Sequence, residues 1–215
     1  MNETVKKKVY LVEDHSVVRQ GLAELVNRQS DLCVCGEADE GGKALIEIGQ
    51  LNPDIALIDL SLKDVSGLDL IKSIRLQFEN VLMLVLTMHT ESFYAERALK
   101  SGAMGYLMKD APFDEVLLAI REVLAGKQYI DKKLASELVS DKSQVKTPIS
   151  SLTDRELEVF RMIGKGISTR DIAQKLHLSI KTIETYRENI KKKLSLKNSA
   201  ELVHEAVQWI ELENR

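Results

Sequence analysis

Hydrophobic residues in the first 125 positions follow two alternating patterns. Short continuous apolar runs, typical of strands buried on both faces, alternate with longer stretches in which apolar residues recur with the helical period. The strand-like runs lie at 8–13, 32–38, 54–59, 81–87 and 104–107. The helical stretches lie at 15–28, 40–50, 67–78, 91–101 and 112–125. Five strand–helix units in series predict a parallel sheet with helices on both faces and the doubly wound strand order 2-1-3-4-5.

The pattern changes after residue 125, and residues 151–211 carry no strand signal. Residues 126–150 are rich in lysine and serine and break the periodicity, so we expect a linker there, helical in part over 134–139. From residue 151, four short helical stretches follow helix-start signals, which are the Thr153–Glu156 capping box, Ser168, Ser179 and Asn198-Ser199. The predicted fold class is therefore α/β, a flavodoxin-like doubly wound five-stranded parallel sheet in residues 1–125, followed by an all-α four-helix helix-turn-helix domain in residues 151–215.

Polar side chains mark the ends of four of the apolar runs. Glu13 and Asp14 follow the first run, Asp59 ends the third, Thr87 ends the fourth and Lys109 follows the fifth. The predicted winding places these strand ends side by side at one edge of the sheet. Carboxylate oxygens are ligands that Mg²⁺ prefers, and a carboxylate can accept a phosphoryl group as an acyl phosphate. Each residue alone is commonly an ordinary strand-end polar group, so the prediction of a phosphoryl-accepting metal site depends on the whole set.

Composition narrows the classes of partner. The composition, with 44% hydrophobic and 29% charged residues, is typical of a soluble globular protein. The sequence shows neither an apolar run of membrane-spanning length nor the pattern of a secretory signal. We therefore expect a cytoplasmic location and no membrane partner. Cys33 and Cys35 are too close along one strand for an ordinary disulfide and are expected to be reduced. Net charge is −5 over residues 1–147 and +2 over 148–215, so nucleic-acid binding must be argued from local placement of charge.

The first 125 residues resemble the receiver domain of bacterial two-component systems. The motifs that carry the resemblance, in order and spacing, are Val12-Glu13-Asp14-His15, Leu57-Ile58-Asp59-Leu60, Leu86-Thr87 and Gly105-Tyr106-Leu107-Met108-Lys109-Asp110. The resemblance implies that Asp59 is the phospho-acceptor, Lys109 contacts the phosphate, and Thr87 and Tyr106 are switch residues. It also implies a Mg²⁺ site made by Glu13, Asp14, Asp59 and the backbone carbonyl of Ser61.

Four positions distinguish this receiver-like sequence from many others. Lys63 and Asp110 stand where many receivers carry proline, although relatives with this two-domain arrangement often have Asp at the latter position. Ser61 and His89 occupy positions that modulate the lifetime of the acyl phosphate in receivers. The resemblance therefore does not fix that lifetime here.

The C-terminal residues resemble a LuxR-type helix-turn-helix domain, and the whole chain resembles NarL/FixJ-type response regulators. The segments that match are Leu152–Val159, Gly166–Ser168, Asp171–Leu176, Ser179–Ile183 and Ile190–Leu194. With Ile183, Ile190 and Leu194 facing inward, the helix over 180–194 turns its other side to the DNA major groove. The predicted DNA contacts are Lys181, Thr182, Glu184, Thr185, Arg187, Glu188, Lys191 and Lys192, with Lys193 as a further phosphate contact.

Alternatives stay open on both of the last helices. Glu184 and Glu188 either accept from cytosine N4 as specificity elements or pair with lysines along their own helix. For the three lysines 191–193, a solvated helix end is the less favoured alternative to phosphate contact. On the last helix the resemblance implies a dimer contact through Leu202, Ala206 and Trp209, whereas packing on the domain core is the alternative. Two-fold dimers would read half-sites about 34–36 Å apart.

The resemblance as a whole implies a two-component response regulator, which is a transcription regulator and not an enzyme. A partner histidine kinase would phosphorylate Asp59 and so switch binding to double-stranded DNA, with a homodimer formed on phosphorylation or on DNA and RNA polymerase as a further candidate partner. An aspartyl phosphatase is disfavoured because Leu60-Ser61 supplies no second carboxylate, and a flavodoxin-like cofactor binder because Glu13 and Asp14 would repel phosphate. A constitutive DNA binder with the same fold stays open.

Overall fold

The protein comprises two compact units in a computed structural model, residues 1–142 and 143–215, and each is described by itself. The structure describes residues 5–88, 92–131 and 148–213. The helix expected over 134–139 and His89 lie outside the described residues.

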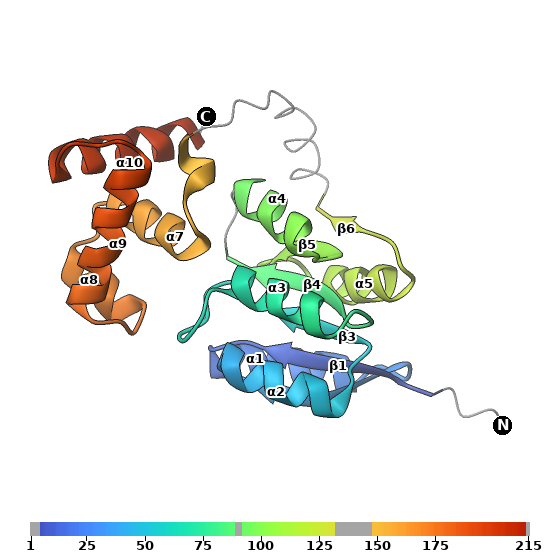
Figure 1. The fold of residues 1–215 in the computed structure, drawn as a ribbon. Coiled ribbons are helices and arrows are strands. Elements are labelled where there is room, and N and C mark those ends of the chain that lie inside the picture. Colours follow the sequence, from blue (N-terminus) through green and yellow to red (C-terminus); the bar gives the residue numbers. More distant parts are fainter. Residues whose placement is uncertain (1–4, 89–91, 132–147, 214–215) are drawn as a thin grey trace. The chain divides into compact units, whose positions relative to one another are not determined.

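A parallel sheet forms the centre of the first unit (Figure 1). Its strands are β1 (Lys7–Val12), β2 (Leu32–Ala38), β3 (Ile55–Ile58), β4 (Leu82–Thr87), β5 (Gly105–Met108) and β6 (Tyr129–Ile130). The strand order is β2-β1-β3-β4-β5-β6, which confirms the predicted order 2-1-3-4-5 and extends it by one edge strand. The extra strand, β6, lies in the segment predicted to be a linker. It was not predicted because two residues are too few to show a period.

Helices cover both faces of this sheet. They are α1 (Ser16–Asn27), α2 (Gly41–Leu51), α3 (Gly67–Gln77), α4 (Ser92–Ser101) and α5 (Phe113–Leu124). Alternate strand residues such as Leu11 and Leu57 form one hydrophobic cluster with residues of α1 and α5. Their neighbours Tyr10 and Ile58 are equally buried and, by the alternation of strand side chains, face the other side. Burial on both faces explains why the strands read as continuous apolar runs.

The second unit is helical in all its regular structure among the described residues. Its elements are η1 (Pro148–Ser151, a 3₁₀ turn), α7 (Asp154–Gly164), α8 (Thr169–Lys175), α9 (Ile180–Lys193) and α10 (Ser199–Glu213). The Thr153 hydroxyl accepts from the Glu156 N–H at 3.3 Å while the Glu156 carboxylate accepts from the Thr153 N–H at 2.7 Å, so the predicted capping box is confirmed. The helices α8 and α9 form the predicted helix-turn-helix, and the Phe160 and Trp209 rings pack 5.7 Å apart between α7 and α10.

Candidate functional site

Three charged side chains meet at the carboxyl edge of the sheet. The Lys109 ammonium nitrogen lies 2.6 Å from Glu13 Oε2 and 2.8 Å from Asp59 Oδ2. Only 7% of the Lys109 side chain is exposed, against 3% for Glu13 and 1% for Asp59. The sheet register produces this meeting, because the Asp59 N–H donates to the Val12 carbonyl and the Lys109 N–H donates to the Thr87 carbonyl, both at 2.9 Å.

The electrostatics of this trio favour a charged lysine. Burial alone would lower the pKa of the Lys109 ammonium, because a dry environment penalises the charged form. Attraction and hydrogen bonding to Asp59, followed by Glu13, more than offset burial and raise that pKa above its ordinary value. Lys109 is therefore a fixed positive charge at neutral pH, held between two acids.

Asp14 and His15 complete an acidic cluster with Glu13 and Asp59. One ligand atom from each of the four residues lies within 4.8 Å of the others. The His15 Nδ1 atom is 2.7 Å from Asp14 Oδ1 and 3.0 Å from Glu13 Oε1. The sequence analysis quoted His15 in a motif without giving it a role. His15 is the N-cap residue of α1 and directly follows the two acids that its ring contacts. This adjacency in the sequence is the signal that could have identified it.

The donor set of this cluster fits a hard divalent cation. Glu13, Asp14 and Asp59 supply carboxylate oxygens, the ligand type that Mg²⁺ prefers. Asp59 Oδ1 is buried and has no hydrogen-bond partner among the described residues. A buried carboxylate oxygen without a donor is costly, and a cation ligated there would remove that cost.

The two predicted switch residues are buried beside the acidic edge. Thr87 ends β4 and Tyr106 lies in β5, and both side chains are inaccessible to solvent. Burial, with a smaller contribution from the Asp59 carboxylate, raises the pKa of the Tyr106 phenol well above its ordinary value. Tyr106 thus occupies an inward position and is a neutral phenol. Ser61, whose carbonyl was predicted as a metal ligand, lies two residues after Asp59 in the β3–α3 loop.

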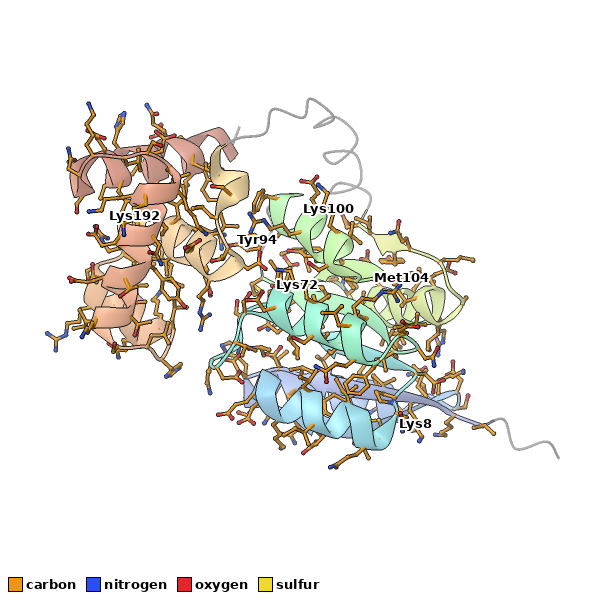
Figure 2. The ribbon with its side chains drawn as sticks, viewed as in Figure 1. Lys8, Lys72, Tyr94, Lys100, Met104 and Lys192 are labelled. Atoms are coloured by element: carbon orange, nitrogen blue, oxygen red, sulfur yellow. The ribbon has the colours of Figure 1, made fainter. Side chains whose placement is uncertain are left out.

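The predicted DNA contacts lie along one side of α9. The fully buried Ile183 and Ile190 point inward, while the exposed residues are Lys181, Glu184, Thr185, Glu188 and Lys192, the last of which is labelled in Figure 2. Thr182, Arg187 and Lys191 are half-buried. A surface pocket brings several of them together with the start of α10, and its lining is Lys181, Glu184, Thr185, Arg187, Glu188 and Ser199.

The two glutamates on this side differ in their contacts. Glu188 Oε1 lies 2.8 Å from the Lys191 ammonium, which lowers the pKa of Glu188. For Glu188, the structure therefore shows the alternative in which the glutamate pairs with a lysine of its own helix. The Glu184 carboxylate has no hydrogen bond or ion pair with any residue that the structure describes. Lys193, expected to contact phosphate, instead places its ammonium 2.6 Å from Glu156 of the α7 capping box.

The residues of the predicted dimer contact on α10 differ in exposure. Leu202 and Ala206 have no solvent-exposed area, so packing within the unit accounts for them. Trp209 is half-buried against Phe160, and Val203 is 41% exposed. A dimer contact through this helix stays a prediction, and it would use exposed side chains such as Val203.

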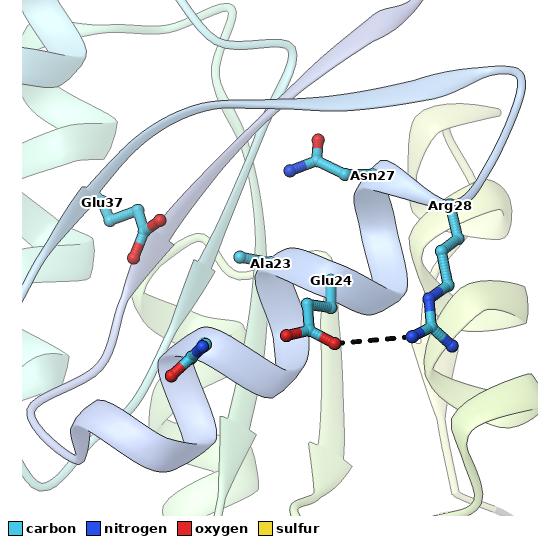
Figure 3. A pocket seen from close by; sticks show the side chains of 6 residues that line it. Ala23, Glu24, Asn27, Arg28 and Glu37 are labelled. Carbon is cyan, nitrogen blue, oxygen red and sulfur yellow. Dashed lines mark hydrogen bonds and ion pairs between the residues drawn. The ribbon is translucent and has the colours of Figure 1, made fainter.

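A second surface pocket lies beside α1, and none of the predicted site residues lines it (Figure 3). Its lining is Gln20, Ala23, Glu24, Asn27, Arg28 and Glu37. Arg28 and Glu24 form an exposed pair at 3.5 Å, and the Asn27 side chain accepts from the Val34 N–H at 2.9 Å. These contacts stabilise the end of α1 and the edge strand β2, and they carry no reactive group.

Comparison with known proteins extends over nearly the whole chain. Residues 9–121 match the response regulator receiver domain family, and residues 150–206 match the bacterial regulatory proteins of the luxR family. The oxygen regulatory protein NreC of Staphylococcus haemolyticus is 38% identical over 210 residues, covering 94% of this chain and 97% of the relative.

Solved structures show the same relationship. A LuxR-family two-component response regulator from Aurantimonas sp. SI85-9A1 has 31% identity and a TM-score of 0.62. The match covers 65% of this chain and 99% of the chain in that structure. ChrA, the response regulator of a heme-sensing two-component system, has 28% identity and a TM-score of 0.53, covering 95% of this chain and 98% of its own. Within the described residues, each helix is too short or too polar to cross a membrane.

Proposed function

The chain belongs to the two-component response regulators that join a receiver domain to a LuxR-type DNA-binding domain, and we propose that phosphorylation of Asp59 controls its DNA binding. As a member of this family it is a transcription regulator. The observation that best supports the proposed switch is the Lys109 ammonium, held between Glu13 and the acceptor Asp59 in an almost dry pocket.

Asp59 would act as the nucleophile. One carboxylate oxygen attacks the phosphorus atom of a phosphohistidine on a partner kinase, the P–N bond breaks, and the histidine nitrogen keeps the electron pair and takes up a proton. Glu13, Asp14, Asp59 and the Ser61 carbonyl would hold Mg²⁺, which supplies charge neutralisation for the transferring phosphoryl group. Lys109 would then move its contact from Asp59 Oδ2 to a phosphoryl oxygen, and Thr87 would donate to another.

The DNA-binding unit would read sequence through α9. Glu184 and Thr185 lie in the first half of this helix, the part that approaches base edges in helix-turn-helix domains. Lys181, Thr182, Arg187, Lys191 and Lys192 would position the helix on phosphates. Glu188, already paired with Lys191, would lessen attraction to DNA of any sequence rather than read a base.

The remaining assignments follow from this role. We propose a sensor histidine kinase and double-stranded DNA as partners, a homodimer on phosphorylation or on DNA, RNA polymerase as a further contact and a cytoplasmic location. We also propose a linker within residues 126–150, apart from Tyr129–Ile130, which form β6. No enzyme activity toward an external substrate is proposed, because Leu60 and Ser61 place no second carboxylate shortly after Asp59.

The test compares wild type with Asp59→Asn, each with and without acetyl phosphate, on DNA sites recovered by genome-wide mapping of bound sites. We expect an acid-labile phosphoryl adduct at Asp59 by mass spectrometry and tighter DNA binding by the treated wild type alone. Equal affinity in all four samples would leave a constitutive DNA binder and remove the switch.

A further inference from the structure

The loop between β3 and α3 connects the acceptor Asp59 to the start of α3, and its last residues contact its first ones. The Gly67 N–H donates to the Leu60 carbonyl at 3.0 Å. A Cβ atom at Gly67 would collide with the carbonyl oxygen of Asp59 and the Cα atom of Leu60, so this close approach needs glycine. The base of the loop is therefore packed directly on the backbone of the acceptor.

The tip of the same loop is fixed to a different element, the N-terminus of α2. Asp64 Oδ1 accepts from the Gly41 N–H at 2.9 Å, and Asp64 Oδ2 accepts from the Gly42 N–H at 2.8 Å. The N-cap residue Glu40 makes no side-chain capping bond, so a residue more than twenty positions away caps this helix. A Cβ atom at Gly41 would collide with Val65, which shows how tightly the loop lies on α2.

The charge state of Asp64 agrees with this clamp. Burial works against its carboxylate, but the hydrogen bonds from Gly42 and Gly41 prevail and lower the pKa of Asp64. Both carboxylate oxygens are engaged with α2, and Asp64 is not a member of the acidic cluster around Asp59. Lys63 precedes it, and lysine, unlike proline, leaves the backbone of the loop free to rotate about φ.

We propose that Asp64 is a positioning residue for the acceptor pocket, holding the β3–α3 loop so that the Asp59 carboxylate and the Ser61 carbonyl face one cation. The inference rests on the proposed function of that pocket. Asp64 acts on the cation through the loop and α2, without touching it. Residues that orient metal ligands in this indirect way typically change metal affinity by about 10–100-fold when replaced.

The experiment measures Mg²⁺ affinity of the full chain by isothermal titration calorimetry. Asp64→Asn keeps the size of the side chain but turns an amide N–H₂ toward one of the two α2 donors, and we expect Mg²⁺ binding about 10-fold weaker. The matched control is Asp69→Asn, which removes an equal charge from an exposed position at the start of α3 and should leave affinity unchanged.

Salt separates positioning from simple loss of charge. A long-range electrostatic effect is largely screened at about 1 M ionic strength, whereas a displaced loop weakens binding at every salt concentration. Weakening by Asp64→Asn that persists in high salt supports the proposal. Weakening that disappears in high salt, or that Asp69→Asn reproduces, overturns it, as does unchanged affinity.

Two further comparisons keep the outcome interpretable. Should Asp64→Asn fail to fold, Asp64→Ser, which retains one capping acceptor, carries the same comparison with an intermediate loss expected. If wild type itself binds no Mg²⁺ and gains no phosphoryl adduct, the proposed pocket function fails. If wild type binds Mg²⁺ and the Asp64 variants bind it equally well, the positioning role alone is wrong.

Discussion

Replacing Lys109 with methionine tests the electrostatic account of the pocket. The change keeps most of the side-chain volume but removes the ammonium from between Glu13 and Asp59, whose side chains are 3% and 1% exposed. Removing one partner of a buried ion pair typically costs about 3–5 kcal/mol, because the remaining charge is left without compensation. The pocket opens toward the partly exposed Asp14, so we take the lower end, about 3 kcal/mol.

This free energy can be read from urea unfolding of the full chain. With a slope of about 2 kcal/mol/M, a loss of about 3 kcal/mol lowers the transition midpoint of the receiver unit by about 1.5 M. Circular dichroism reports the helices of both units, while fluorescence of Trp209, the one tryptophan in the sequence, follows the second unit alone and should not change. The part of the circular dichroism transition that Trp209 fluorescence does not follow belongs to the receiver unit. The control Lys100→Met removes an exposed partner of Glu96 and should cost no more than about 1 kcal/mol.

Magnesium supplies the second arm of this test. Lys109 competes with the cation for the same carboxylates, so Lys109→Met should bind Mg²⁺ more tightly than wild type. Saturation at about 100 times the dissociation constant adds about 2.7 kcal/mol of stability, which would recover most of the loss. A midpoint shift no larger than that of Lys100→Met, or one that Mg²⁺ leaves unchanged, would refute the reasoning.

Three further predictions concern other contacts. Glu184→Gln should relax or change the preferred base at one operator position, with a loss of about 1–3 kcal/mol of discrimination between bases. Glu188→Gln should instead tighten binding to DNA of all sequences. Selection from random DNA libraries with both variants separates the two effects. Glu156→Ala should cost the second unit about 1–2 kcal/mol by loss of the capping box and the Lys193 contact, seen as an earlier Trp209 fluorescence transition in urea. The lowered pKa of Asp64 adds stability that is present above its unfolded pKa of about 3.9 and is lost as pH falls through the folded value, so Asp64→Asn should flatten acid unfolding curves below about pH 4.

Sequence patterns predicted the elements whose signals are local and repeated. The meeting of Glu13, Asp59 and Lys109 at one edge of the sheet was predicted because continuous apolar runs define buried parallel strands, and the winding rule then fixes where their polar ends meet. The capping box at Thr153 and the hydroxyl caps at Ser168 and Ser179 were predicted because each bonds within one turn of its own residue. These features need no knowledge of tertiary contacts.

Contacts between distant segments left no such signal. The Asp64 clamp on α2 and the Lys193 pair with Glu156 join residues 22 or more positions apart, and no spacing rule relates them. The apolar stripe of α10 was compatible with both a dimer contact and a core, and burial of Leu202 and Ala206 favours the core. The strand β6 was missed because two residues show no period.

The arrangement around Lys109 also limits how strong the switch can be. Its ammonium satisfies two carboxylates before phosphorylation, so contact with a phosphoryl oxygen must replace an existing contact rather than add a new one. Moving an equilibrium from 1% to 99% active needs about 5.5 kcal/mol, and a charge-assisted hydrogen bond contributes about 1.5–3 kcal/mol. In the proposed switch, Lys109 alone would therefore fall short of so complete a change. The Thr87 hydroxyl is the further contact that we propose. Since the Thr87 carbonyl already accepts from the Lys109 N–H, the ends of β4 and β5 would respond to the phosphoryl group together.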